Sequence, residues 1–238
     1  MASPRDFEGS ILGVVTRMIT DWLARVREAV FGAGRLYPDP SAVQNAAPAW
    51  ADLIDSQLLP ALEKVSAAGW EDTSGQGYIS TNGFVLAQLA MTRNLLVRMP
   101  GEVYNLIFEQ IVIGQTDGET RERIADRIDS VLFFTGSEYW PNRAKTIAVT
   151  ETHRAWQGGT LAAAQFYEPA TGPGWFKTWN AEDDDNTRPC HRRADGQRRR
   201  LRDTFQVCGE DLMYPGDPVG SAANVINCRC DMHITEAS

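Results

Sequence analysis

The sequence predicts an α+β protein, with a mostly helical N-terminal region followed by a small C-terminal α+β module of short strands. Apolar residues recur every three or four positions as far as residue 166, which is typical of amphipathic helices. No strand-type alternation appears before residue 170. After the helix-breaking segment 168–174, short apolar runs alternate with turns rich in Gly, Pro and Asp. We therefore expect a helical region over residues 1–136 and a second domain over residues 137–238, with the small module starting near residue 175.

Composition narrows the function classes. The net charge of −8 argues against a protein that coats nucleic acid with its whole surface, although a local basic patch is compatible with it. No run approaches the roughly 18 apolar residues that span a bilayer. The N-terminus shows no apolar signal region, and four cysteines are too few for a disulfide-dense secreted scaffold. We expect synthesis in a reducing cytoplasm and no membrane partner.

The first predicted helix carries apolar residues on one face from Phe7 to Val30 and ends at Gly32-Ala33-Gly34. A second helical pattern covers residues 41–68. Pro60 is expected to kink or split this helix, because proline lacks a backbone donor and its ring crowds the preceding turn.

Four more helices are expected before the module. Helical spacing covers residues 84–99, and Pro100 suits the first position of the next helix. Thr116 and Glu119 have the spacing of a capping box for a further helix. The last long helix is predicted over residues 138–166.

Glu151 lies on a stripe of alanines on this last helix, so we expect its carboxylate to be buried. An isolated buried charge is too costly to leave unpaired, which predicts an arginine partner. Arg188 is the first candidate for a structural ion pair with Glu151, and Arg154 is the second. A structural pair is favoured over a catalytic role.

The module is expected to contain short strands over residues 175–179, 204–207 and 225–234, with a helical turn near 188–194. Residues two apart in a strand point to one face, so Cys228 and Cys230 would present both sulfurs to one point. His191, with Cys190 or Cys208, would complete a set of ligands for a structural zinc ion.

Other interpretations of the cysteines remain open, because the usual pair of closely spaced zinc ligands is missing. The cysteines could be free buried thiols or could only fill space. Cys190 and Cys208 could also form a disulfide after release from the cell.

His191 with Asp195 resembles a general-base or nuclease pair, but a single histidine near an acidic run is weak support for catalysis. The alternative is that His191 locks a loop by hydrogen bonds. No catalytic residue is assigned.

Seven arginines fall between residues 188 and 202, which is the clearest local departure from an acidic chain. Arginine forks suit phosphates and carboxylates equally. The cluster therefore predicts contact with DNA phosphates or with an acidic partner, and its central members are Arg192, Arg193, Arg198, Arg199 and Arg200. The alternative is an exposed loop that pairs with the protein's own excess acid.

Several of these pieces together resemble the MuF-type phage head-morphogenesis proteins, also called minor head or minor capsid proteins. The resemblance covers about residues 140–232, and Cys190 and Cys208 are additions to the family pattern. The matching pieces are Thr150-Glu151-Thr152, Lys177-Thr178-Trp179, Thr187-Arg188, His191, Asp195-Gly196, Phe205, Tyr214-Pro215-Gly216-Asp217-Pro218 and Asn227-Cys228-Arg229-Cys230.

The resemblance implies a low-copy structural component inside the head of a tailed phage, assembled in the host cytoplasm and associated with the portal. It would act in head assembly, genome packaging or DNA delivery. Its partners would be the portal protein, capsid or scaffold proteins and, through phosphate contacts, genomic DNA. Two alternatives remain: a phage-encoded nuclease or toxin-like hydrolase that uses His191, and an adaptor without DNA contact.

Overall fold

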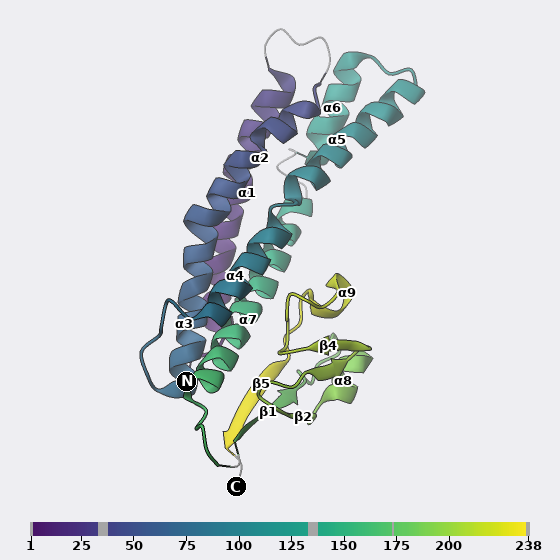
Figure 1. Ribbon diagram of the computed structural model, residues 1–238. Helices are drawn as coiled ribbons and strands as arrows, with labels where there is room; N and C mark the ends of the chain where they lie inside the picture. The colour runs from purple at the N-terminus through teal and green to yellow at the C-terminus, as the bar shows by residue number, and fades with distance from the viewer. Residues whose placement is uncertain (1, 33–37, 133–137, 173, 237–238) are drawn as a thin grey trace. The chain divides into compact units, whose positions relative to one another are not determined.

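The computed structural model describes residues 2–32, 38–132, 138–172 and 174–236 (Figure 1). Within these residues long helices come first and short antiparallel strands follow, which confirms the predicted α+β class. Two compact units are formed, one by residues 13–59 and 93–145 and the other by residues 1–12, 60–92 and 146–238. The domain boundary predicted at residues 136 and 137 lies outside the described residues.

The helical elements follow the predicted order. Their bounds are α1 Arg5–Phe31, α2 Ser41–Leu53, the π-helical turn η1 Ile54–Leu58, α3 Leu59–Ser74, α4 Gly83–Leu96, α5 Met99–Thr116, α6 Arg121–Leu132 and α7 Tyr139–Tyr167. The first and last of these helices match their predicted ranges closely. Part of the predicted end of α1, at residues 33 and 34, lies outside the described residues.

The helix predicted over residues 41–68 is divided, and Pro60 lies where α3 begins. Proline offers no N–H to the carbonyl four residues earlier, that of Ser56, and the wider turn η1 lies at this point of the chain. The α-helix is thus interrupted near Pro60 as predicted, but by a π-helical turn within a chain that stays helical from residue 41 to residue 74.

The capping box predicted from Thr116 and Glu119 is wrong. Thr116 is the last residue of α5, which ends where Gly118 adopts a left-handed φ of 66° and the amide of Glu119 donates to the carbonyl of Gly114. Helix α6 is capped instead by Thr120, whose hydroxyl accepts from the amide of Arg123 at 3.4 Å.

Helix α7 is the centre of its unit, because every residue from Ile147 to Ala164 is buried. Two glycines allow a close approach between α3 and α7. A Cβ at Gly69 would lie 2.5 Å from the carbonyl oxygen of Trp156, and a Cβ at Gly159 would collide with the carbonyl oxygen of Ser66. The small residues of α7 therefore serve close helix packing in addition to surrounding Glu151.

The C-terminal module adds seven short elements to the same unit. They are β1 Trp175–Asn180, α8 Pro189–Ala194, β2 Arg198–Arg200, β3 Phe205–Val207, β4 Glu210–Leu212, α9 Ala222–Val225 and β5 Asp231–Glu236. Strand β1 lies between β2 and β5 in an antiparallel sheet, and β3 pairs with β4 in a separate hairpin (Figure 1).

The strand predicted over residues 225–234 begins only at Asp231. Residues 222–225 form the short helix α9, and Asn227 then turns the chain with a left-handed φ of 55°. Cys228 and Cys230 therefore precede the strand instead of lying within it.

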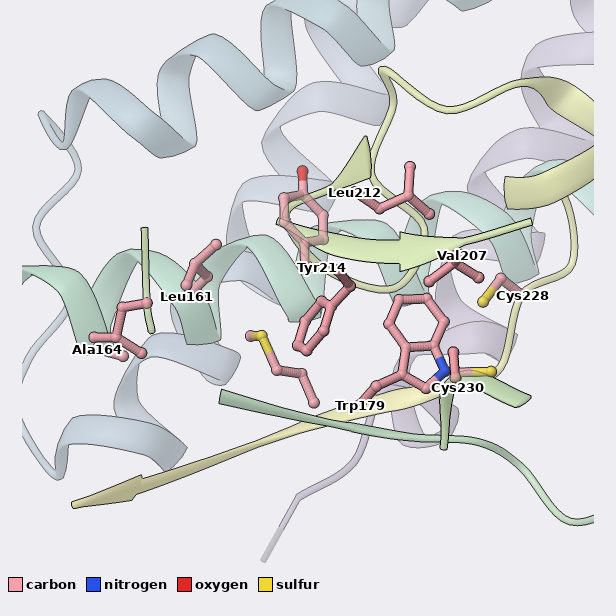
Figure 2. Packing of buried hydrophobic residues seen from close by; sticks show 12 residues of the cluster. Leu161, Ala164, Trp179, Val207, Leu212, Tyr214, Cys228 and Cys230 are labelled. Atoms are coloured by element: carbon pink, nitrogen blue, oxygen red, sulfur yellow. The ribbon is translucent and has the colours of Figure 1, made fainter. Parts of the chain in front are cut away.

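The core of the module joins the strands to α7. Leu161 and Ala164 of α7 pack in one cluster with Trp179, Phe205 and Tyr214. Figure 2 shows the labelled members of this cluster, with Cys228 and Cys230 at the end away from Ala164. Trp179 is fully buried in this cluster, whereas Trp175 only packs against it.

Candidate metal centre

His191 of α8 meets two cysteines from the segment between α9 and β5. Its Nδ1 lies 3.4 Å from the Sγ of Cys230 and 3.7 Å from the Sγ of Cys228. The exposed fractions of the three residues are only 2% for His191, 3% for Cys228 and 2% for Cys230. The predicted convergence of these three side chains is confirmed, although a turn at Asn227 brings the sulfurs together instead of strand alternation.

Asn224 of α9 fixes which ring nitrogen of His191 carries a proton. The Nδ2 of Asn224 donates to the carbonyl of Val207 at 3.0 Å and to the carboxylate of Glu210 at 2.9 Å. Its Oδ1 is therefore the acceptor that faces the Nε2 of His191 at 2.7 Å. The Nε2 must then donate, which leaves the lone pair of Nδ1 directed at the two sulfurs in the neutral imidazole.

The two thiols have different acidities. A hydrogen bond from Cys228 lowers the pKa of Cys230 to about 5. The hydrogen bond to Cys230 and burial raise the pKa of Cys228 well above its usual range. Cys230 is therefore the thiol that ionises first, and one thiolate is present beside the ring near neutral pH.

The expected ligand set is only partly assembled. Cys190 and Cys208 are joined by a disulfide bond, so their sulfurs are not available to complete the set with His191. Cys208 and Gly209 form the two-residue loop of the β3–β4 hairpin, with φ values of 53° and 80°. This turn presents Cys208 toward α8, which carries Cys190, and the bond ties the hairpin to that helix.

His191 is not paired with Asp195. The Oδ1 of Asp195 accepts from the backbone amide of Ala181 at 2.8 Å, while both nitrogens of His191 face Asn224 and the cysteines. The general-base pair that the sequence supported only weakly is therefore not formed by these residues. The alternative interpretation, that His191 holds the fold locally by hydrogen bonds, agrees with its contact with Asn224.

Of the two arginines expected as partners of Glu151, Arg188 is wrong and Arg154 is confirmed. Glu151 pairs with Arg154, whose Nη1 lies 2.8 and 2.7 Å from the two carboxylate oxygens. One turn of helix separates these residues, so the local partner meets Glu151 without help from the module. Arg188 donates from Nη2 to the carbonyl of Ile226 at 2.7 Å and holds the turn before Cys228.

Three more side chains of this unit form hydrogen bonds to the backbone of loops. The Nε of Arg154 donates to the carbonyl of Gly216 at 2.8 Å, and the Nζ of Lys177 donates to the carbonyl of Met213 at 2.6 Å. The carboxylate of Asp217 accepts from the amides of Met213 and Val219. These contacts give the 214–218 turn an architectural role.

A side chain of α7 also holds the turn that precedes Cys228 and Cys230. The amide of Asn227 donates to the Oγ1 of Thr150 at 3.0 Å. Thr150 lies on α7, so the turn that positions Cys228 and Cys230 is anchored to the central helix of the unit.

The predicted arginine cluster is divided between two elements. Arg192 and Arg193 lie on α8 and are exposed. Arg198 and Arg200 lie on one face of the edge strand β2, where their guanidinium groups are 3.8 and 4.3 Å from the ring centre of Phe176. Arg199 points to the other face, and its Nε donates to the carbonyl of Thr204.

Sequence reasoning missed Asn224, which orients His191. Asn224 stands in a short Ala-rich segment and belongs to no motif piece, and its distance from His191 is 33 residues along the chain. The contact between Asn224 and His191 arises because α9 packs against the β3–β4 hairpin, and the order of residues along the chain does not indicate it.

Comparison with known proteins gives one match. The family model described as "Phage Mu protein F like protein" matches residues 103–233, which is more than half of the chain. No curated protein and no solved structure matches this chain. The matched range contains α7 and the whole set formed by His191, Asn224, Cys228 and Cys230.

Proposed function

Because this chain belongs to the phage Mu protein F-like family, whose role is in phage head morphogenesis, we infer that it is a structural minor head protein of a tailed phage. We place it inside the capsid, in association with the portal. Its activity there is in head assembly, genome packaging or DNA delivery.

The burial of His191 is the observation that carries this proposal. A general base must reach a proton on a substrate, but His191 is 2% exposed and both of its ring nitrogens face groups of the core. The side chains of the motif hold loops to α7 and to each other. This supports a module built for a stable shape instead of one built around an open catalytic site.

The helical region over residues 1–136 supplies the docking surface for the portal or head in this proposal. Helix α5 presents an apolar stripe of the half-buried Tyr104 and the exposed Phe108 and Val112, in which the rings of Tyr104 and Phe108 stack with centroids 6.2 Å apart. Residues four apart lie on one face of a helix, and Phe108 and Val112 are 50% and 44% exposed. Such a stripe suits a protein partner, because exposed apolar surface is stabilised by burial at an interface.

No helix among the described residues is long and apolar enough to cross a membrane. The proposed partners are head proteins and DNA.

Assembly of heads tests the docking proposal. Heads are produced in cells from a phage that lacks this gene, with the wild-type chain or a Phe108→Ser/Val112→Ser variant supplied from a plasmid. We expect the wild-type chain in purified heads and several-fold less of the variant. A Leu86→Ser/Met91→Ser variant, changed at exposed residues of α4, is the control and should be incorporated normally. Equal incorporation of all three chains contradicts the proposed surface.

DNA contact is proposed for the exposed arginines of β2 and α8. Each phosphate contact makes the slope of log Kobs against log salt more negative by about 0.9, so removal of Arg198 and Arg200 should make the slope less negative by about 2. An Arg198→Gln/Arg200→Gln variant is compared with the wild-type chain by a salt titration of duplex DNA binding. Arg121→Gln/Arg123→Gln on α6 is the control. Identical slopes for the wild-type chain and the β2 variant refute DNA contact by these arginines and favour the adaptor alternative.

A further inference from the structure

We propose that His191, Cys228 and Cys230 hold one Zn²⁺ ion through Nδ1 and the two Sγ atoms. The ion fixes the segment before β5 to helix α8. This inference depends on the geometry of the site and not on the proposed role in the phage head.

The distances between the donor atoms fit a zinc tetrahedron. Bond lengths of about 2.3 Å to sulfur and about 2.0–2.1 Å to nitrogen place the corners of such a site about 3.6 Å apart for sulfur and nitrogen. The Nδ1 of His191 lies 3.4 Å from one sulfur and 3.7 Å from the other, and all three donor atoms lie within 4.8 Å of one another. An ion can therefore enter between them with small side-chain adjustments.

The imidazole is held in the protonation state that a metal ligand needs. Asn224 accepts from Nε2, so the lone pair of Nδ1 is available on the side of the sulfurs. Asn224 is itself oriented by Val207 and by the carboxylate of Glu210. Metal-binding histidines usually donate a hydrogen bond from the other ring nitrogen to a neighbouring group, which fixes the tautomer and the orientation of the ring.

The kinds of donor select the metal. Two thiolates and one imidazole prefer Zn²⁺ over hard cations such as Mg²⁺ or Ca²⁺, which bind oxygen ligands. The surroundings are apolar, because Cys228 and Cys230 pack in the core cluster and Trp179 contacts His191 edge-on with ring centroids 5.6 Å apart. Such a closed site serves structure, and two thiolates balance the charge of the ion.

The disulfide-bonded pair is excluded from the ligand set. Cys190 and Cys208 also lie near His191, but their sulfurs are bonded to each other. Apart from the proposed ligands, the described residues contain two more histidines, which are His153 on α7 and His233 on β5. Neither of the last two belongs to a cluster with metal-ligand spacing.

Metal analysis of the purified full chain tests the site. The chain is loaded with Zn²⁺, passed over a desalting column, and its zinc is measured by mass spectrometry. We expect one Zn²⁺ per chain for the wild type and an occupancy at least tenfold lower for Cys228→Ser, Cys230→Ser and His191→Ala. The matched control is Cys190→Ser/Cys208→Ser, which should keep full occupancy. Loss of zinc from that control, or its retention in the three ligand variants, overturns the assignment.

A measurement on the unaltered chain covers the case in which the ligand variants fail to fold. Two free thiols should be protected from a thiol reagent in the zinc-loaded protein and should react after a chelator removes the ion. Loading with Co²⁺ should give the visible absorption of a tetrahedral thiolate complex. A folded wild-type chain without bound metal, or with thiols that react equally before and after chelation, contradicts the proposal.

Asn224→Ala tests the supporting role of the amide. Loss of such a partner lowers metal affinity by about 10- to 100-fold. We expect this weakening with the stoichiometry still one Zn²⁺ per chain at saturation. An unchanged affinity would show that Asn224 does not orient the ligand.

Discussion

The buried pair of Glu151 and Arg154 gives the sharpest test of how α7 supports the module. Arg154 is 2% exposed, and its guanidinium group contacts both carboxylate oxygens of Glu151 and the carbonyl of Gly216. The Oε2 of Glu151 also accepts from the Oγ1 of Thr92 at 3.1 Å. Arg154→Met would leave a buried carboxylate without its cation and remove a donor from the loop.

The expected cost follows from these contacts. Removal of one member of a buried ion pair destabilises a protein by about 3–5 kcal/mol, and the lost hydrogen bond to Gly216 contributes about 1 kcal/mol. We therefore predict that Arg154→Met lowers the free energy of unfolding by about 4 kcal/mol or more. Glu151→Gln should cost a comparable amount, because it leaves the guanidinium group uncompensated.

Urea denaturation of the single variants and of the double variant forms a double-mutant cycle. Removal of both charges should restore part of the loss, with a coupling energy of about 2 kcal/mol or more. The control is Arg5→Met, which breaks the ion pair of Arg5 with Glu182, whose side chains are 53% and 30% exposed. That variant should cost less than about 1 kcal/mol. A cost for Arg154→Met as small as that of the control, or strictly additive effects, refutes the reasoning.

Three further predictions concern packing, titration and the disulfide. Gly159→Ala should destabilise the protein by about 1–3 kcal/mol, because its Cβ meets a carbonyl oxygen of α3, whereas Gly9→Ala in open space on α1 should be neutral or stabilising by thermal denaturation. Burial lowers the pKa of Lys177 from 10.5 to about 8, so the unfolded chain binds more protons between these values and stability should rise with pH across pH 8–10.5, by at most about 1.4 kcal/mol per unit; this rise should be absent in Lys177→Met, and equal pH profiles would contradict it. Reduction of the Cys190–Cys208 bond, which closes a loop across a separation of 18 residues, should cost about 3 kcal/mol and lower the Tm, while a Cys190→Ser/Cys208→Ser variant should show no such shift on reduction.

The helices were predictable because each depends on local periodicity. The spacing of apolar residues located α1 and α7 within a few residues, and the alanine stripe showed that Glu151 is buried. The partner of Glu151 was harder to predict, because the sequence offers both Arg154, one helical turn away, and Arg188 of the module. Helix geometry favours the nearer one.

The module was less predictable because its elements are short. Strands β2 and β4 have three residues each, too few for an alternation to be recognised, and tertiary pairing with β1 and β3 defines them. The segment of Cys228 and Cys230 was assigned to a strand, yet the left-handed turn at Asn227 decides where the sulfurs point.

The candidate site was predictable by residue type but not by arrangement. His191, Cys228 and Cys230 were expected together, and they converge. The contact of His191 with Asn224 depends on the packing of α9 against the β3–β4 hairpin, which no spacing along the chain reports.

The amount of chain found in purified phage heads, measured for the wild type and for His191→Ala, tests the central claim that this histidine serves the shape of a head protein. The account predicts that His191→Ala lowers incorporation in proportion to the fraction of folded protein, and that whatever is incorporated supports infection normally. Heads that contain a folded His191→Ala chain in full amount but fail to package or deliver DNA would contradict it, because that outcome is the signature of a lost enzyme.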